Sequence, residues 1–249
     1  MQVLGSYGKA RNYIEKHYEE SDAARIHRRK LNPGPTITIS RETGVGAAAI
    51  CEKLIEYLRR YVLPEYNDWT YFDRELIEKV MEDHHLPAHF KKLLSEETPP
   101  KIDAWFGEIL GITPSKISLL HKKRHTILKL AEFGNVIIVG QGSSIITSHL
   151  PTSFHVRLVA PLSFRIENAV ELYNFDRKQT TDFIIKEDES RKDFIHKYFH
   201  KNIEDPLLYH LVINTSFLKF EEIAEMIGQC IIRKFPGFFS LQSNELVNE

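Results

Sequence analysis

The sequence predicts an α/β fold with a parallel sheet, because short strand-like apolar segments alternate with helix-like segments along the chain. A loop containing two glycines, residues 41–48, separates the first strand-like segment from a helix. A continuous apolar run, residues 136–139, is typical of a central strand covered on both faces. Ligands of parallel sheets bind beyond the carboxyl ends of the strands. We therefore expect functional residues in the turns that follow the strands.

The first strand and helix frame the glycine loop. Residues 36–40 alternate β-branched and small side chains, as strands do. One apolar helix face then recurs in Ala47, Ile50, Cys51, Leu54 and Leu58. Such a loop directs backbone N–H groups and a helix N-terminus at one point, which suits a phosphate. The residues predicted to surround a nucleotide phosphate here are Ser40, Arg41, Thr43, Gly44, Val45, Gly46, Ala47 and Ala48.

The loop departs from the complete phosphate-binding pattern G-x-x-x-x-G-K-[ST]. Arg41 replaces the first glycine and Gly46 is kept. Ala47 replaces the lysine and Ala48 replaces the hydroxyl residue that usually binds magnesium. The sequence therefore predicts the shape of a phosphate loop without its usual charge and metal ligand.

The rest of the chain continues the alternation. Further strands are expected to end at residues 71–72 and to lie at 154–159 and 211–214. Helices are expected at residues 162–174, 180–200 and 220–232. The segment 81–125 is helix-like but interrupted by prolines. This order favours one large α/β domain.

Two flanking segments have a different character. The charged N-terminal segment has sparse apolar positions and predicts a helix over residues 8–30, which ends at a proline–glycine cluster. We therefore divide the chain into a helical extension (1–34), a main domain (35–236) and a C-terminal tail (237–249) that we expect to be loosely ordered. No observation predicts the oligomeric state.

Composition excludes several classes of protein. The net charge of −1 gives no global basic field for nucleic acid or an anionic membrane. Two cysteines form no disulfide framework, which fits a reducing cytosol. No apolar run approaches the ~20 residues of a membrane span or the pattern of a signal peptide. We therefore expect a cytoplasmic protein that binds neither nucleic acid nor membrane, and no residue cluster predicts a metal site.

Four stretches in this order resemble the cytidylate kinase-like family, a branch of the phosphate-loop nucleoside monophosphate kinases. They are residues 39–46 with the following helix, 72–77, 136–142 and a C-terminal run over 156–216. The resemblance implies a P-loop NTPase fold with three α/β/α layers and a parallel five-stranded sheet. It also implies a nucleoside monophosphate-binding segment and a helical lid at about residues 176–205.

The resemblance also implies a reaction, the transfer of the ATP γ-phosphoryl group to a nucleoside monophosphate such as CMP or dCMP. ATP and Mg²⁺ are the expected small-molecule partners. Asp73 and Arg74 would lie near the acceptor nucleotide, and Arg165 and Arg191 would belong to or flank the lid. With Arg41 at the loop, these two arginines are the candidate catalytic residues, because planar guanidinium groups bind phosphate oxygens bidentately.

The turn after the third strand departs from this family pattern. Cytidylate kinases carry Gly-Arg-Asp there, whereas this chain has Gly140-Gln141-Gly142, so Gln141 is the candidate nucleotide contact. Arg41 either fills part of the gap or forms a structural ion pair with Glu42 or a neighbouring acid. Two hypotheses follow: an active nucleoside monophosphate kinase, or a catalytically degenerate nucleotide-binding or regulatory module on the same fold.

Overall fold

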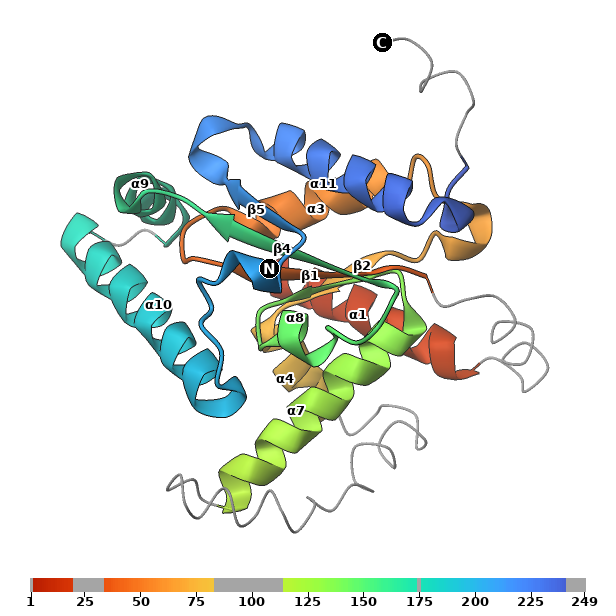
Figure 1. Ribbon diagram of the computed structural model, residues 1–249, viewed down its shortest axis with the longest axis horizontal. Helices are drawn as coiled ribbons and strands as arrows, with labels where there is room; N and C mark the ends of the chain where they lie inside the picture. The colour runs from red at the N-terminus through yellow and green to blue at the C-terminus, as the bar shows by residue number, and fades with distance from the viewer. Residues whose placement is uncertain (1, 20–33, 83–113, 174–175, 241–249) are drawn as a thin grey trace.

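A computed structural model describes residues 2–19, 34–82, 114–173 and 176–240 (Figure 1). Its five strands form one all-parallel sheet in the order β2-β3-β1-β4-β5. The strands are β1 (Thr36–Arg41), β2 (Thr70–Phe72), β3 (Val136–Val139), β4 (Ser153–Val159) and β5 (Leu211–Asn214). The predicted fold class is confirmed, because each predicted strand segment pairs within this sheet.

Strand β1 is central, and its register aligns the carboxyl ends of its neighbours. Ile37 lies opposite Ile137 of β3 and Phe154 of β4. Beyond the strands, the backbone N–H of Gly140 donates to the Ile39 carbonyl (2.9 Å). The glycine loop and the turn after β3 are therefore held side by side at one edge of the sheet, as parallel pairing requires.

One face of the sheet is covered by α3 (Ala47–Leu58) and α11 (Phe220–Lys234), which lie side by side (Figure 1). Ile37 and Ile39 of β1 pack there with Leu54 of α3 and Ile227 of α11, and all four are fully buried. The predicted apolar face of α3 is thus the face that covers the sheet.

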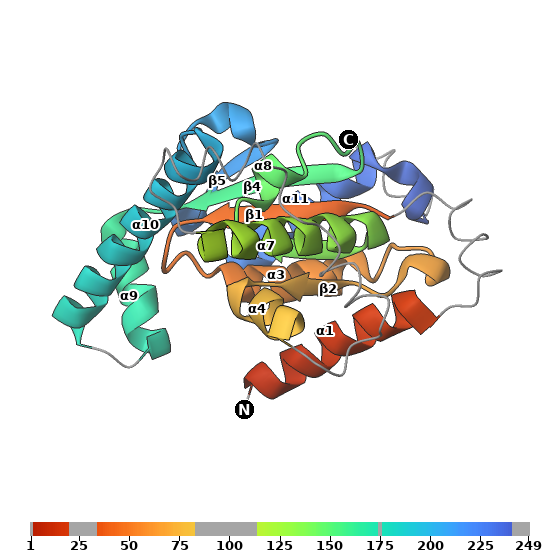
Figure 2. The ribbon, with the colours of Figure 1, turned by 90° about the horizontal axis from the view of Figure 1, so that it is seen from below.

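The opposite face carries α4 (Arg74–Glu82), α7 (Pro114–Phe133) and the short α8 (Ser143–Ile146) (Figures 1 and 2). Its core includes Phe72, Ile77, Ile127 and Ile138. The two covered faces give the three-layer arrangement. Within the proline-interrupted segment 81–125, residues 83–113 lie outside the described part of the chain.

Helix α1 (Gln2–Glu19) packs on α4 and β2 (Figure 2). Ala10, Tyr13 and Ile14 are buried, and the Tyr13 hydroxyl donates to the carbonyl of Gly134. The helix begins earlier than predicted, and residues 20–30 of its predicted span lie outside the described residues. The described part of the extension therefore contributes to the second core, while its separation as a unit of its own stays a prediction.

The chain also remains packed beyond the predicted end of the main domain. After η4 (Pro236–Phe238), both Phe238 and Phe239 are buried, and Phe239 forms a bridge to Val62. The prediction of a loosely ordered tail is therefore wrong for residues 237–240, because two aromatic side chains supply apolar area to bury. Three more short 3₁₀ helices are η1 (Pro64–Tyr66), η2 (Pro206–Leu208) and η3 (Thr215–Phe217).

Helices α9 (Leu162–Tyr173) and α10 (Arg177–Phe199) form an arm at the carboxyl edge of the sheet (Figures 1 and 2). The Asp176 side chain caps α10 by accepting from the Gln179 backbone N–H (2.8 Å). The arm has a small apolar cluster of its own, formed by Ile166, Ala169 and Ile184. Helix α10 lies in the segment predicted as a lid, about residues 176–205, and α9 precedes that segment.

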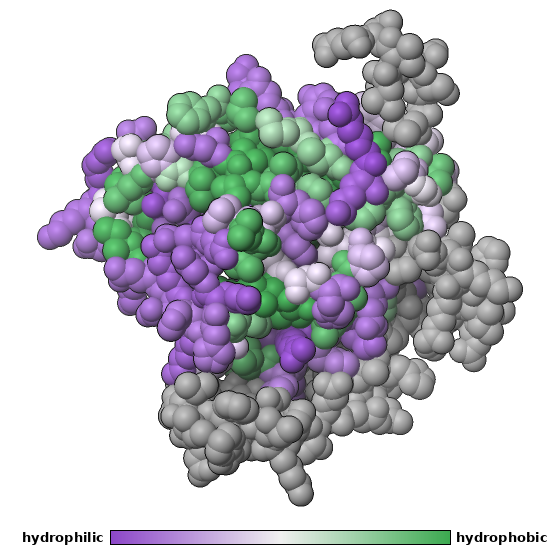
Figure 3. Space-filling model, viewed as in Figure 1, coloured by the Kyte–Doolittle hydropathy of each residue, from purple (hydrophilic) through white to green (hydrophobic). Residues whose placement is uncertain are grey.

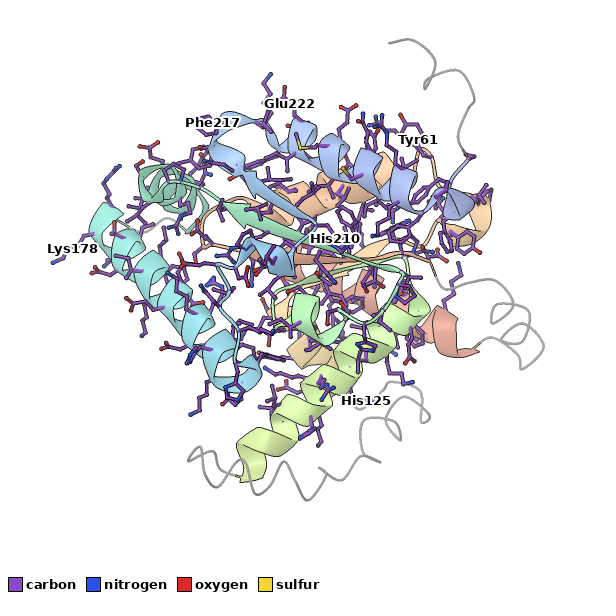
Figure 4. All side chains as sticks on the ribbon, viewed as in Figure 1. Tyr61, His125, Lys178, His210, Phe217 and Glu222 are labelled. Atoms are coloured by element: carbon purple, nitrogen blue, oxygen red, sulfur yellow. The ribbon has the colours of Figure 1, made fainter. Side chains whose placement is uncertain are left out.

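A buried histidine, His155, predicts a pH-dependent stability. The His155 Nδ1 lies 2.8 Å from the Thr38 hydroxyl, and its ring is 5.1 Å from that of His210, which lies between β4 and β5 (Figure 4). Burial, then the positive charges of His210 and Lys234, lower the pKa of His155 from 6.5 to about 4.

Because this folded-state pKa lies below the unfolded value, His155 favours the folded state fully above pH 6.5 and progressively less as the pH falls toward 4. We expect His155 to account for a loss of about 2 kcal/mol in the free energy of unfolding between pH 7 and pH 5. Urea unfolding at both pH values measures this, and His155→Gln should show a smaller loss. An equal loss in both proteins would contradict the assignment.

Candidate functional site

The glycine loop joins β1 to α3 in a backbone conformation that needs glycine. Gly44 and Gly46 have φ angles of +87° and +82°, in the left-handed region. A Cβ on Gly46 would lie 2.2 Å from the Phe220 ring, and one on Gly44 would lie 2.4 Å from the Arg165 carbonyl oxygen. Conformation and close packing therefore both fix the loop at the N-terminus of α3.

Gly46→Ala should lower the free energy of unfolding by about 2 kcal/mol, because it adds a strained φ angle and a contact with Phe220. Chemical denaturation measures the change. The matched control is Gly8→Ala in α1, where a Cβ meets nothing within 4 Å. The higher helix propensity of alanine should raise the free energy of unfolding there by up to about 1 kcal/mol. Equal changes in the two variants would show that the loop tolerates a side chain.

Asp188 of α10 reaches the glycine loop from the arm. Its Oδ1 accepts hydrogen bonds from the backbone N–H and from the hydroxyl of Thr43, both at 2.8 Å. Its Oδ2 accepts from Nη1 of Arg165 at 2.5 Å. The Asp188 side chain is only 16% exposed. A carboxylate from the arm therefore faces the polar groups of the loop.

Arg165 of α9 is held by several oxygen atoms besides those of Asp188. Its Nε donates to the Ala160 carbonyl (2.9 Å) and its Nη1 donates to the Thr43 carbonyl (3.2 Å). Its Nε also lies 3.4 Å from the Glu42 carboxylate, which accepts from the Ala160 backbone N–H (3.0 Å). Arg165 thus ties the arm, the loop and the end of β4 together.

Arg191 of α10 contacts the loop through Thr43. Its Nη2 and Nη1 donate to the Thr43 hydroxyl oxygen at 2.6 and 3.0 Å, and its Nη1 donates to the Glu187 carbonyl (2.8 Å). The Asp188 carboxylate lies 3.6 Å away. The arginine therefore lies at the junction of α10 and the loop.

Arg41 follows β1 at the start of the loop and is half-buried against the turn after β3. A Cβ on Gly140 would lie 2.1 Å from its Nη1. Within the described parts of the chain, no carboxylate lies within ion-pair distance of Arg41. Burial, then the positive charge of Arg191, lower its pKa to about 10, against the opposing charge of Asp73.

The alternative that Arg41 pairs with Glu42 is therefore wrong, because Glu42 turns to Ala160 and Arg165. A cation in such surroundings attracts an anion, since the residues that the structure describes place no countercharge in contact with it.

Two cavities flank Arg41 and Arg191. The larger has a volume of about 200 Å³ and lies between the ends of β1 and β4 and the arm. The smaller, about 30 Å³, lies between α10 and the turn that precedes α8. Hydrophilic side chains gather over α10 in this view of the surface (Figure 3). Besides Arg41 and Arg191, the residues that line the smaller cavity include Ser40, Gln141, Ser143, Ser144, Phe194 and Tyr209.

The structure thus brings many of the predicted site residues together. Arg41 and Arg191 line both cavities, while Ser40 and Gln141 line the smaller and Arg165 the larger. Of the loop residues, Val45 is buried in the core, and Ala47 and Ala48 form the first turn of α3.

The two residues predicted to lie near the acceptor, Asp73 and Arg74, line neither cavity. The Asp73 side chain accepts a hydrogen bond from the Leu76 backbone N–H (2.9 Å), as an N-terminal helix cap does. Arg74 is exposed and lies 3.3 Å from Glu78, one turn along α4. In this conformation they have local structural contacts, and a role toward an acceptor stays a prediction.

Sequence reasoning did not select Arg157, Asp188 or the serines that follow Gln141 as site residues. Arg157 offered a signal, because it is a charged residue within the apolar strand segment 154–159. Asp188 offered none locally, since charged residues surround it on an exposed helix.

The described residues contain no cluster of three His, Cys, Asp or Glu side chains suited to a metal ion. Ala48 lacks the hydroxyl that usually binds magnesium, and the Thr43 hydroxyl is already bonded to Asp188 and Arg191. The loop therefore does not fit the usual magnesium ligand set.

None of the described helices is both long and apolar enough to cross a bilayer.

A sequence model of the cytidylate kinase-like family matches residues 36–217, which include the sheet, the glycine loop and the arm. The chain belongs to the cytidylate kinase-like family. The predicted resemblance is thereby confirmed.

Individual relatives match over shorter stretches. Over 103 residues the chain is 33% identical to a cytidylate kinase of Staphylothermus marinus, covering 41% of this chain and 56% of that protein. Over 100 residues it is 23% identical to a uronate isomerase of Corynebacterium glutamicum, covering 40% of this chain and 19% of that protein. The chain therefore spans less than two thirds of these curated relatives.

A solved structure shares the fold over a longer span. It is an uncharacterized protein from Eubacterium ventriosum, with a TM-score of 0.59 and 20% sequence identity. The likeness covers 80% of this chain and 98% of that one. It therefore places this cytidylate kinase-like chain in a fold that a second protein adopts over nearly its whole length.

Proposed function

We propose that this cytidylate kinase-like protein transfers the γ-phosphoryl group of ATP to a nucleoside monophosphate, with CMP and dCMP as the first acceptors to test. The observation that carries the proposal is the convergence of Arg41, Arg165 and Arg191 on one glycine loop. Catalysis of phosphoryl transfer consists mainly of positioning and of stabilising charge on the phosphate oxygens. The likeness to a cytidylate kinase supports the choice of acceptor.

The residues divide into three roles. The loop backbone over 44–48 holds the donor phosphates at the N-terminus of α3, and ATP brings magnesium as its complex. Arg41 stabilises charge on the transferring group, and Arg191 brings further positive charge from the arm. Arg165 holds the arm against the loop through its bonds to Asp188 and to the Thr43 carbonyl. The hydroxyl groups that line the smaller cavity offer hydrogen bonds to the acceptor.

Binding requires the arm to move. The Thr43 N–H is bonded to Asp188, and the smaller cavity of about 30 Å³ has room for little more than a water molecule. We expect α10 to swing away as a nucleotide arrives and to close again over it, which excludes water from the transferring phosphate.

The proposal is tested by measuring ADP formation from ATP and Mg²⁺ with CMP, dCMP, UMP, AMP or GMP in turn. We expect ADP to appear only when an acceptor is present, and fastest with CMP or dCMP. Reactions without acceptor give the background of ATP hydrolysis. If no acceptor raises ADP formation above that background, the protein is not a nucleoside monophosphate kinase.

A second candidate is a nucleotide-binding or regulatory module without turnover. Ala47, Ala48 and Gln141 favour it, because they remove the charge, the hydroxyl and the arginine that kinases of this type use. Calorimetric titration with ATP separates the two functions. Binding of ATP without acceptor-dependent ADP formation would support the module.

A further inference from the structure

Arg157 of β4 is a buried arginine at the carboxyl edge of the sheet. The residue is only 4% exposed. Its Nη1 donates to the Ser40 hydroxyl oxygen (2.9 Å), and its guanidinium lies 5.8 Å from the centre of the Tyr209 ring. The Tyr209 hydroxyl is itself held by the Ile203 carbonyl (2.8 Å). Neutral groups therefore hold the Arg157 side chain.

In the described part of the chain, no countercharge is in contact with the guanidinium of Arg157. Among the residues that the structure describes, none carries a carboxylate within ion-pair distance of this guanidinium. Glu204 is close enough to interact electrostatically with Arg157, but the ion pair of Glu204 is with Lys192 (2.6 Å). Arg165 differs, since two acids neutralise it. An isolated buried charge is costly, so its presence in a strand calls for an anionic ligand.

Arg157 lines the larger cavity together with Arg41 and Arg191. Five cationic and three acidic side chains surround this space of about 200 Å³, which leaves an excess of two positive charges. That excess matches the charge of a phosphate monoester dianion. Arg41 and Arg157 reach the cavity from neighbouring strands, whereas Arg191 reaches it from α10. The three guanidinium groups are therefore placed to contact one phosphate from two sides.

We propose that Arg157 is an additional phosphate-binding residue and that the larger cavity receives a phosphate group of a nucleotide. The inference rests on the proposed function. It deepens that function by adding a guanidinium from β4 in a chain whose turn after β3 has Gln141 in place of the usual arginine. It requires no reaction, because the predicted event is binding alone. A nucleotide phosphate and free inorganic phosphate share this chemistry, and titration with each distinguishes them.

Isothermal titration of the full chain with CMP, ATP, inorganic phosphate and cytidine tests the inference. Arg157→Met, which removes the charge but keeps an unbranched apolar side chain, should weaken binding of CMP or ATP by about 10- to 100-fold. Cytidine, which lacks the phosphate, should bind both proteins alike. The matched control is Arg233→Met, at an exposed position near the end of α11, which should bind as the wild type does.

Thermal unfolding without nucleotide separates a binding role from a structural one. Because Arg157 has no ion pair to lose, Arg157→Met should keep or raise the melting temperature of the free protein, while the rise caused by nucleotide should shrink. Arg157→Lys keeps the charge without the bidentate fork and should weaken nucleotide binding about fivefold with the fold intact.

Three results would overturn the inference: unchanged nucleotide affinity in both Arg157 variants, a wild-type protein that binds none of the phosphate probes, or tight binding of inorganic phosphate alone. Nucleotide binding that depends on Arg157, without any turnover, would instead refute the proposed kinase activity and leave the inference standing. Turnover by the wild type, with nucleotide affinity and rate unchanged in Arg157→Met, would instead support the kinase activity and refute the inference about Arg157.

Discussion

Replacing Arg41 with alanine should lower the rate of acceptor-dependent ADP formation by about 10³-fold, the scale seen when a guanidinium that stabilises phosphoryl transfer is lost. Arg41 lines both cavities at the start of the glycine loop, and its pKa is lowered to about 10 by burial and by Arg191. Its position between the two cavities is where the transferring phosphate would pass from donor to acceptor.

The fold should survive this substitution. Arg41 forms no ion pair with any acid in the described ranges. Arg41→Ala therefore removes a charge without leaving a buried acid unpaired among those residues. The melting temperature should change by only a few degrees. The rate is measured with CMP or dCMP at saturating ATP, beside Arg233→Ala as an exposed arginine control. A rate within threefold of the wild type would remove Arg41 from the mechanism.

Asp188→Asn should lower the free energy of unfolding by about 3 kcal/mol. The carboxylate accepts two hydrogen bonds from Thr43 and forms an ion pair with Arg165 at 2.5 Å in surroundings that are mostly buried. Asparagine keeps the shape of the side chain but not its charge. Among the described residues, Arg165 would then retain only Glu42, at 3.4 Å, as a nearby acid.

The control for this prediction lies on the same helix. Asp193 is exposed on α10, so Asp193→Asn should change the free energy of unfolding by less than about 0.5 kcal/mol. Urea unfolding of the two variants and the wild type measures both values. Equal stability of Asp188→Asn and Asp193→Asn would show that the contact between α10 and the loop does not hold the arm in place.

The sheet could be predicted because its information is local. The alternation in residues 36–40 and the continuous apolar run at 136–139 state the strand type directly, and both segments are strands. The glycine loop was equally visible, since the strand, Gly44, Gly46 and the helix follow each other within one short segment. The alternation of apolar segments predicted the remaining strands, and the family resemblance then implied the five-stranded, three-layer arrangement.

The network at the loop could not be predicted in the same way. Thr43 and Asp188 are 145 residues apart in sequence, and only the path of the arm back to the sheet brings them together. Arg157 reads in sequence as one charge in a strand, and its meaning depends on which acids lie near it in space. The packing of Tyr13 and Ile14 on the second core was hidden for the same reason, because apolar positions are sparse in α1.

The most direct test of the central claim follows the phosphoryl group itself. The protein is incubated with Mg²⁺, CMP and ATP that is labelled at the γ-phosphate, and the products are separated. The account predicts that the label appears at the β-position of CDP, in an amount equal to the ADP formed. Label found only in inorganic phosphate, or left entirely in ATP, would contradict it.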